Sequence, residues 1–106
     1  MDIRQSHFLL KERIRTEARH SREAYQVVLR MKKLLPDSLK ALKSCHRTGN
    51  SAAQAERLAL TDPDYQTSIE EYLTIYQQGL ESRIQWETHK MLLAARQSLQ
   101  AFHRSL

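Results

Sequence analysis

Residues 63–105 read PDYQTSIEEYLTIYQQGLESRIQWETHKMLLAARQSLQAFHRS, and the only helix breaker after Pro63 is the glycine at position 79. One glycine costs a helix only about 1 kcal/mol relative to alanine. Asp62 is a typical helix N-cap, and proline is favoured at the position that follows a cap. We therefore predict one helix over residues 63–105, roughly 63 Å long at 1.5 Å per residue.

Apolar and aromatic residues form a stripe along one face of this predicted helix. Their mean spacing is about 3.7 residues, nearer to an eleven-residue repeat than to a strict heptad, which argues against a long left-handed coiled coil. We expect this stripe to face the core. Its members are Tyr65, Ile69, Tyr72, Tyr76, Leu80, Ile84, Thr88, Met91, Ala95, Leu99, Phe102 and Leu106.

Residues 2–35 predict a second long helix, because their apolar residues recur mostly at spacings of three, four or seven. Pro36 is expected to end this helix, since proline disfavours helical backbone in the residue before it. Asp37 or Ser38 can then cap a short helix over residues 38–46. Cys45, the single cysteine, excludes an internal disulfide and is interpreted as a small apolar residue of that short helix.

Residues 47–50 form the clearest loop, because Gly49 and Asn50 tolerate positive φ and can close a helix. Ser51 and Gln54 fit the capping-box pattern and predict a helix over residues 51–60. Whether that helix joins the one at 63–105 through a kink or a break stays open.

These elements predict an all-α fold and a single helical domain over residues 1–106. The two long helices can cover each other only as a long antiparallel hairpin, with one or two short helices at the connection. Because two helices alone make a thin core, we expect two hairpins to form a dimeric helical bundle. The predicted partner is therefore a second copy of the chain, a homodimer.

The charge is unevenly distributed along the chain. Residues 1–50 hold 12 Lys and Arg against 5 Asp and Glu, whereas residues 51–106 hold 5 against 7. This asymmetry can steer an acidic partner toward the basic half of the chain. It can equally help the basic and acidic halves, of one chain or of two chains, to lie against each other. No apolar run reaches the roughly 18 residues that span a membrane, and the first residues lack the features of a signal peptide. We expect a cytoplasmic protein without a membrane partner.

The sequence contains no pattern that predicts catalysis, a metal site or a cofactor. Five histidines and one cysteine are present, but no two histidines stand at i, i+4 and none has the paired spacing of a zinc site. No glycine-rich elbow or phosphate-cradling loop occurs. We therefore expect no catalytic residues, no metal, no cofactor and no small-molecule substrate, and we classify the chain as not an enzyme.

A row of cations on the first long helix is a candidate nucleic-acid contact, since phosphate contacts supply salt-dependent and sequence-independent affinity. The row lacks glycines and aromatic platforms for base stacking. A solvated or protein-binding face is therefore the favoured interpretation, and nucleic acid is the alternative. The candidate residues are Lys11, Arg15, Arg19, Arg22, Arg30 and Lys33.

Apolar residues outside the main stripe of the 63–105 helix predict a second contact surface. Trp86, Leu73 and Leu93 lie outside that stripe, and tryptophan is enriched in the residues that dominate interface energetics. Tyr76 lies one turn from Tyr72 and is interpreted as a core or interface residue. We predict a partner interface formed by Leu73, Tyr76, Trp86 and Leu93.

Residues 51–105 resemble small helical accessory proteins of phages and prophages. The resemblance rests on the corner at Glu56, Arg57, Ala59, Leu60, Asp62 and Pro63, which is followed by a long helix. It implies a non-enzymatic accessory role, with DNA metabolism as one setting. The segment from Pro36 to Asn50 departs from the pattern of those proteins.

These observations favour a non-enzymatic helical adaptor or scaffold that acts through protein–protein contacts and self-association. A nucleic-acid-binding accessory protein that uses the basic N-terminal helix is the first alternative. A secretion-type chaperone or regulator is the second, and it predicts one tight protein partner. The sequence does not separate the adaptor from the chaperone.

Overall fold

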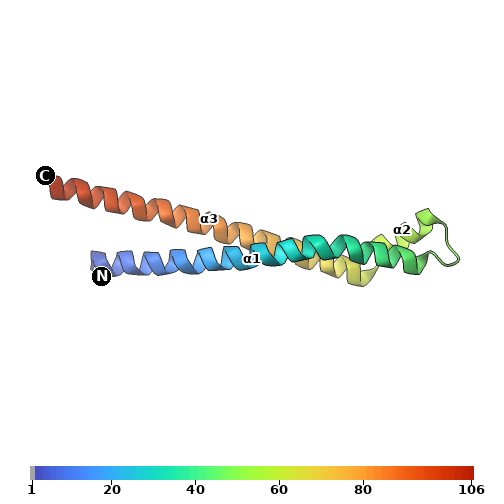
Figure 1. Cartoon of the computed structure of the whole chain (residues 1–106). Helices are drawn as coiled ribbons and strands as arrows, with labels where there is room; N and C mark the ends of the chain where they lie inside the picture. The colour runs from blue at the N-terminus through green and yellow to red at the C-terminus, as the bar shows by residue number, and fades with distance from the viewer. Residues whose placement is uncertain (1) are drawn as a thin grey trace. The chain divides into compact units, whose positions relative to one another are not determined.

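The computed structural model describes residues 2–106 and contains three helices (Figure 1). They are α1 (Ile3–His46), α2 (Ala52–Leu60) and α3 (Pro63–Ser105). No strand occurs among the described residues, so the predicted all-α class is confirmed. In the described part of the chain, no helix is both long and apolar enough to cross a membrane.

Helix α1 continues through Pro36, so the predicted break between residues 35 and 38 is wrong. Pro36 is exposed and lies on the solvent side of the helix. Leu35 and Leu39 flank it on the packed side and are both partly buried. A proline inside a helix removes one hydrogen bond, to the carbonyl of Lys32. Packing of the apolar face on both sides of Pro36 outweighs that loss, and neither Asp37 nor Ser38 serves as a cap.

The predicted turn and caps are confirmed. Gly49 has a φ of 77°, the left-handed conformation that glycine adopts without steric cost. Ser51 and Gln54 form a complete capping box at the start of α2. An Oδ1 atom of Asp62 accepts hydrogen bonds from the backbone N–H groups of Asp64 and Tyr65, both at 3.0 Å. Thr61 and Asp62 therefore separate α2 from α3, which settles the open question of their continuity.

The chain divides into two compact units, which are described separately. The first, here called the terminal unit, joins the chain up to Glu23 with Gln78–Leu106. The second, the corner unit, is Ala24–Gln77. Helices α1 and α3 each contribute one part to each unit.

In the terminal unit, the N-terminal part of α1 lies antiparallel to the C-terminal part of α3 (Figure 1). The direction follows from two contacts: Arg96 donates to Ser6 at 3.2 Å, and His89 lies 2.7 Å from Glu17. Leu10 is the buried apolar residue of this unit. From Ala94 onward every residue of α3 except Gln100 is exposed, so α1 covers only part of α3 here.

In the corner unit, α2 packs through its alanine face. Ala55 and Ala59 are 2% and 0% exposed, and Val28 of α1 is also buried. Lys43 near the end of α1 forms an ion pair with Glu56 of α2 at 3.4 Å. Alanine has no side chain beyond Cβ, so its face permits the close approach of helices that this packing requires.

The packed face of α3 coincides with part of the predicted stripe in the corner unit and departs from it in the terminal unit. The less exposed positions include Tyr65, Tyr72, Gly79, Trp86 and Leu93, which are spaced by seven residues. Leu80, Ile84 and Met91 were expected in the core and are exposed. The prediction of a core stripe is therefore wrong in the terminal unit, because α3 has apolar residues on two opposite sides there and the more apolar side faces solvent. In the corner unit, Tyr65, Ile69 and Tyr72 of the predicted stripe are partly buried.

We expect Pro36→Ala to raise the free energy of unfolding by about 1–3 kcal/mol, because it restores a backbone hydrogen bond and removes a steric clash within α1. Urea denaturation followed by circular dichroism at 222 nm measures this. Ser38→Ala, at another exposed position of the same helix, is the control and should change stability by less than about 0.5 kcal/mol. An unchanged or lower stability of Pro36→Ala would argue against a continuous α1.

Candidate functional site

A shallow groove of about 350 Å³ runs along the surface of the terminal unit. Each of the two helices contributes side chains that are one or two turns apart. Side chains at this spacing lie on the same face of a helix, so each helix forms one wall of the groove. The lining residues are Lys11, Ile14 and Arg15 of α1, and Trp86, Lys90, Leu93, Ala94 and Gln97 of α3. The groove therefore combines an apolar floor with three cationic side chains.

The groove brings together residues that the sequence assigned to two different surfaces. Trp86 and Leu93 belong to the predicted partner interface, and Lys11 and Arg15 to the predicted nucleic-acid contact. In the sequence, the basic row itself contains no aromatic residue for base stacking. The structure places Trp86 beside Lys11 and Arg15, because antiparallel packing in the terminal unit aligns these parts of α1 and α3.

The remaining predicted site residues lie outside the groove. Leu73 and Tyr76 are exposed and belong to the corner unit. Arg19 is within 4.0 Å of Glu23 in an exposed pair on α1. Arg22, Arg30 and Lys33 are exposed along the same helix. The six candidate cations thus follow α1, and two of them line the groove.

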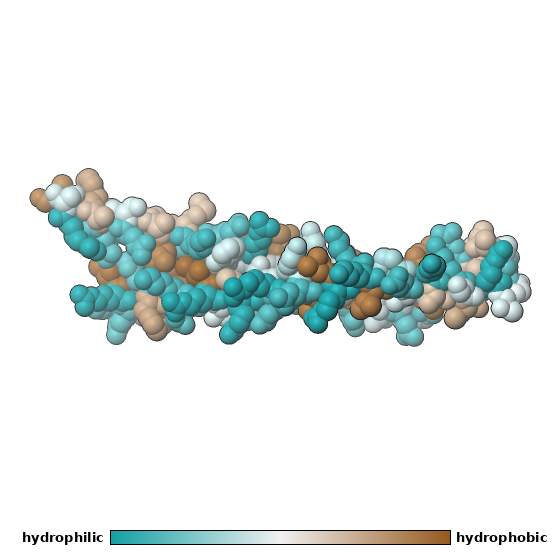
Figure 2. Space-filling model, viewed as in Figure 1, coloured by the Kyte–Doolittle hydropathy of each residue, from teal (hydrophilic) through white to brown (hydrophobic). Residues whose placement is uncertain are grey.

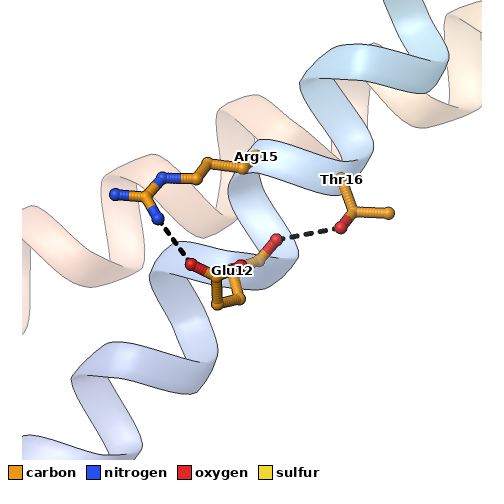
Figure 3. Close-up of polar contacts among 3 residues, drawn as sticks. All are labelled: Glu12, Arg15 and Thr16. Atoms are coloured by element: carbon orange, nitrogen blue, oxygen red, sulfur yellow. Dashed lines mark hydrogen bonds and ion pairs between the residues drawn. The ribbon is translucent and has the colours of Figure 1, made fainter.

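Two of the three groove cations have a neighbour that limits their freedom. The ammonium of Lys90 lies over the Trp86 ring, 4.7 Å from its centroid, in the range of a cation–π contact. The guanidinium of Arg15 donates to the carboxylate of Glu12, whose backbone carbonyl accepts a hydrogen bond from Thr16 (Figure 3). Among the described residues, no ion pair to Lys11 is found. Lys11 is therefore the cation most available to an incoming anion.

A partly buried polar pair, Glu17 and His89, lies in the terminal unit and was not predicted from the sequence. Glu17 is buried, and its Oε2 lies 2.7 Å from Nδ1 of His89. The two atoms are within hydrogen-bond distance of each other. The spacing in the sequence could have indicated that Glu17 faces the core. Glu17 lies seven residues from both Leu10 and Ala24, which places all three on the packed face of α1.

The lining of the groove determines which ligand groups it can contact. The groove offers an apolar surface and positive charge, which together favour a ligand with apolar and anionic groups. Within residues 2–106, no group of three or more His, Cys, Asp or Glu is placed to hold a metal ion. Cys45 is exposed and lies in the corner unit.

Compared with known proteins, the chain gives no match to any family model, to any curated protein or to any solved structure. The resemblance of residues 51–105 to small helical phage and prophage proteins therefore stays a prediction. The exposed surfaces and the groove are therefore the features of the molecule that bear on its function.

We expect Glu17 and His89 to be coupled energetically. A double-mutant cycle of Glu17→Ala and His89→Ala, followed by urea denaturation, should give a coupling energy of about 1–2 kcal/mol, because each single substitution leaves a partly buried polar group without its partner. The exposed pair Arg83 and Glu87, joined at 3.2 Å, is the control. Its coupling should stay below about 0.5 kcal/mol, and equal values for the two pairs would contradict a structural role for Glu17.

Proposed function

We propose that this chain is a non-enzymatic helical adaptor that self-associates and acts through protein–protein contacts. The observation that carries the proposal is a row of large apolar side chains exposed along α3. Its members are 47–73% exposed. This row, here called the exposed stripe, lies in the terminal unit and consists of Leu80, Ile84, Met91, Leu99 and Phe102.

The exposed stripe lies on the side of α3 opposite to its packed face. At about 100° per residue, Ile84 and Met91 point away from Trp86, His89 and Leu93. Figure 2 shows hydrophobic side chains at the surface of the terminal unit, next to the hydrophilic side chains along α1. A helix with two apolar faces needs a partner on each of them, and large exposed apolar patches mark interaction sites.

The chain buries little apolar surface by itself. No large side chain is fully buried among the described residues. Covering the exposed stripe would stabilise the fold by on the order of 5–10 kcal/mol per chain, as an upper bound.

In this proposal a second copy of the chain covers the exposed stripe. Each chain contributes an antiparallel hairpin of α1 and α3, and two hairpins associate into a four-helix bundle. A closed twofold dimer makes the stripe of each copy the partner of the other. The surfaces left outside the bundle, including the cationic face of α1, are then available to a different protein.

We expect the wild-type chain to sediment as a dimer at micromolar concentration, and Ile84→Glu to weaken the dimer at least tenfold (about 1.4 kcal/mol), because it places one charge from each chain in an apolar interface. Sedimentation equilibrium measures both values. Gln85→Glu introduces the same charge at an exposed neighbouring position outside the stripe and should leave the dimer unchanged.

Circular dichroism distinguishes loss of association from loss of folding. Ile84 is half exposed in the single chain, so its substitution by Glu should preserve the helical signal at concentrations where the wild-type chain is monomeric. A folded wild-type monomer at all micromolar concentrations, or a dimer that tolerates Ile84→Glu, would contradict self-association through the stripe.

A further inference from the structure

We infer that the groove of the terminal unit binds an acidic segment of a partner protein. In this arrangement an apolar side chain of the segment contacts Ile14 and Leu93, and its carboxylates contact Lys11 and Lys90. The inference rests on the proposed adaptor function and names the chemistry of one of its partners. It concerns a different surface from the exposed stripe.

The floor of the groove fits an apolar side chain. Ile14, Trp86 and Leu93 are each partly buried and line the groove together, so they supply its apolar surface. Ala94 adds no bulk beyond its Cβ and leaves the groove open on that side. A segment that inserts a leucine or phenylalanine here removes apolar surface from water on both partners.

The charge around the groove selects an anionic partner. Three cations line the groove and no carboxylate does. The terminal unit as a whole carries ten Lys and Arg against six Asp and Glu, while the corner unit carries seven against six. The nearby acids are engaged: Glu12 pairs with Arg15 and Glu17 with His89. Electrostatic complementarity of this kind sets partner choice and the rate of association.

The geometry at Trp86 favours an acidic polypeptide over single-stranded nucleic acid. Proteins that bind single strands stack bases on the faces of aromatic rings. The ammonium of Lys90 occupies a face of the Trp86 ring at 4.7 Å, so a base could stack there only after displacing it. A carboxylate can approach the same ammonium from outside without disturbing its contact with the ring.

The inferred segment and a second copy of the chain would not compete. Trp86 and Leu93 point to one side of α3, and Ile84 and Met91 to the other. An adaptor built in this way can hold its dimer partner on the stripe while it binds another protein in the groove. Dimerisation would then present two grooves, which raises the avidity for a partner with two acidic segments.

Trp86 is the single tryptophan of the chain and lines the groove, so its fluorescence reports on occupancy directly. The probe is a short synthetic peptide of Asp, Glu and Leu without tryptophan, titrated into the full chain. Two controls match it: the same peptide with Asn and Gln in place of the acids, and a short oligo-dT. We expect a saturable change in Trp86 emission with the acidic peptide and none with the neutral one.

Charge reversal at the groove tests the contact further. Lys11→Glu should weaken binding of the acidic peptide about tenfold, and Lys11→Gln should weaken it less, because removing a rim cation weakens the attraction and reversing it adds repulsion. Lys32→Glu makes the same charge change at an exposed position of α1 in the corner unit. This control should bind the peptide within about twofold of the wild-type chain.

Several results would overturn the inference. They are an unchanged Trp86 emission up to about 1 mM peptide, equal binding of the neutral peptide, equal weakening by Lys32→Glu, or oligo-dT that binds more tightly than the acidic peptide. Sedimentation of the same samples separates this inference from the proposed function. A dimer that does not bind the peptide refutes the groove assignment alone, whereas a monomer that binds it refutes self-association alone.

Discussion

The constraint on which the rest of this structure depends is that α3 carries apolar side chains on two opposite faces, while α1 covers one of them. In the terminal unit α1 takes the face of Trp86 and Leu93. The face of Ile84 and Met91 stays in contact with water. Because this second face stays exposed, the single chain removes less apolar surface from water, and burial of apolar surface is the main stabilising contribution in small helical folds. The thin core and the proposed self-association both follow from the fact that α1 covers one apolar face of α3 and leaves the other exposed.

A polar contact lies between the packed faces of α1 and α3 in the terminal unit. Glu17 and His89 lie within 2.7 Å of each other at positions of the packed faces. Burying either group alone would be unfavourable, because an unpaired buried polar group loses its hydrogen bonds to water. A register that turned Ile84 toward α1 would separate the pair. The packed face thus satisfies these polar groups, whereas the opposite face carries large exposed apolar side chains such as Ile84 and Met91.

Because α1 covers only one face of α3, the chain has two surfaces of different chemistry, the exposed stripe and the groove. The exposed stripe is an apolar row on the part of α3 in the terminal unit, which suits an identical apolar surface on a second copy. The groove is apolar in its floor and cationic at its edges, which suits a segment of opposite charge. Because the two surfaces point to opposite sides of α3, the proposed self-association and the inferred partner binding can operate together in one adaptor.

The sequence by itself determined the local features of this protein. The helical class, the turn at Gly49, the capping box of Ser51 and Gln54, and the cap at Asp62 follow from conformational preferences and hydrogen bonds within a few residues. Tertiary structure decided the features that depend on contacts between residues far apart in the sequence. Packing carries α1 through Pro36 against its local preference, pairs Glu17 with His89 across 72 positions, and places Trp86 beside Lys11 and Arg15. Periodicity reveals that α3 has apolar faces, but only contact with α1 decides which of them is buried.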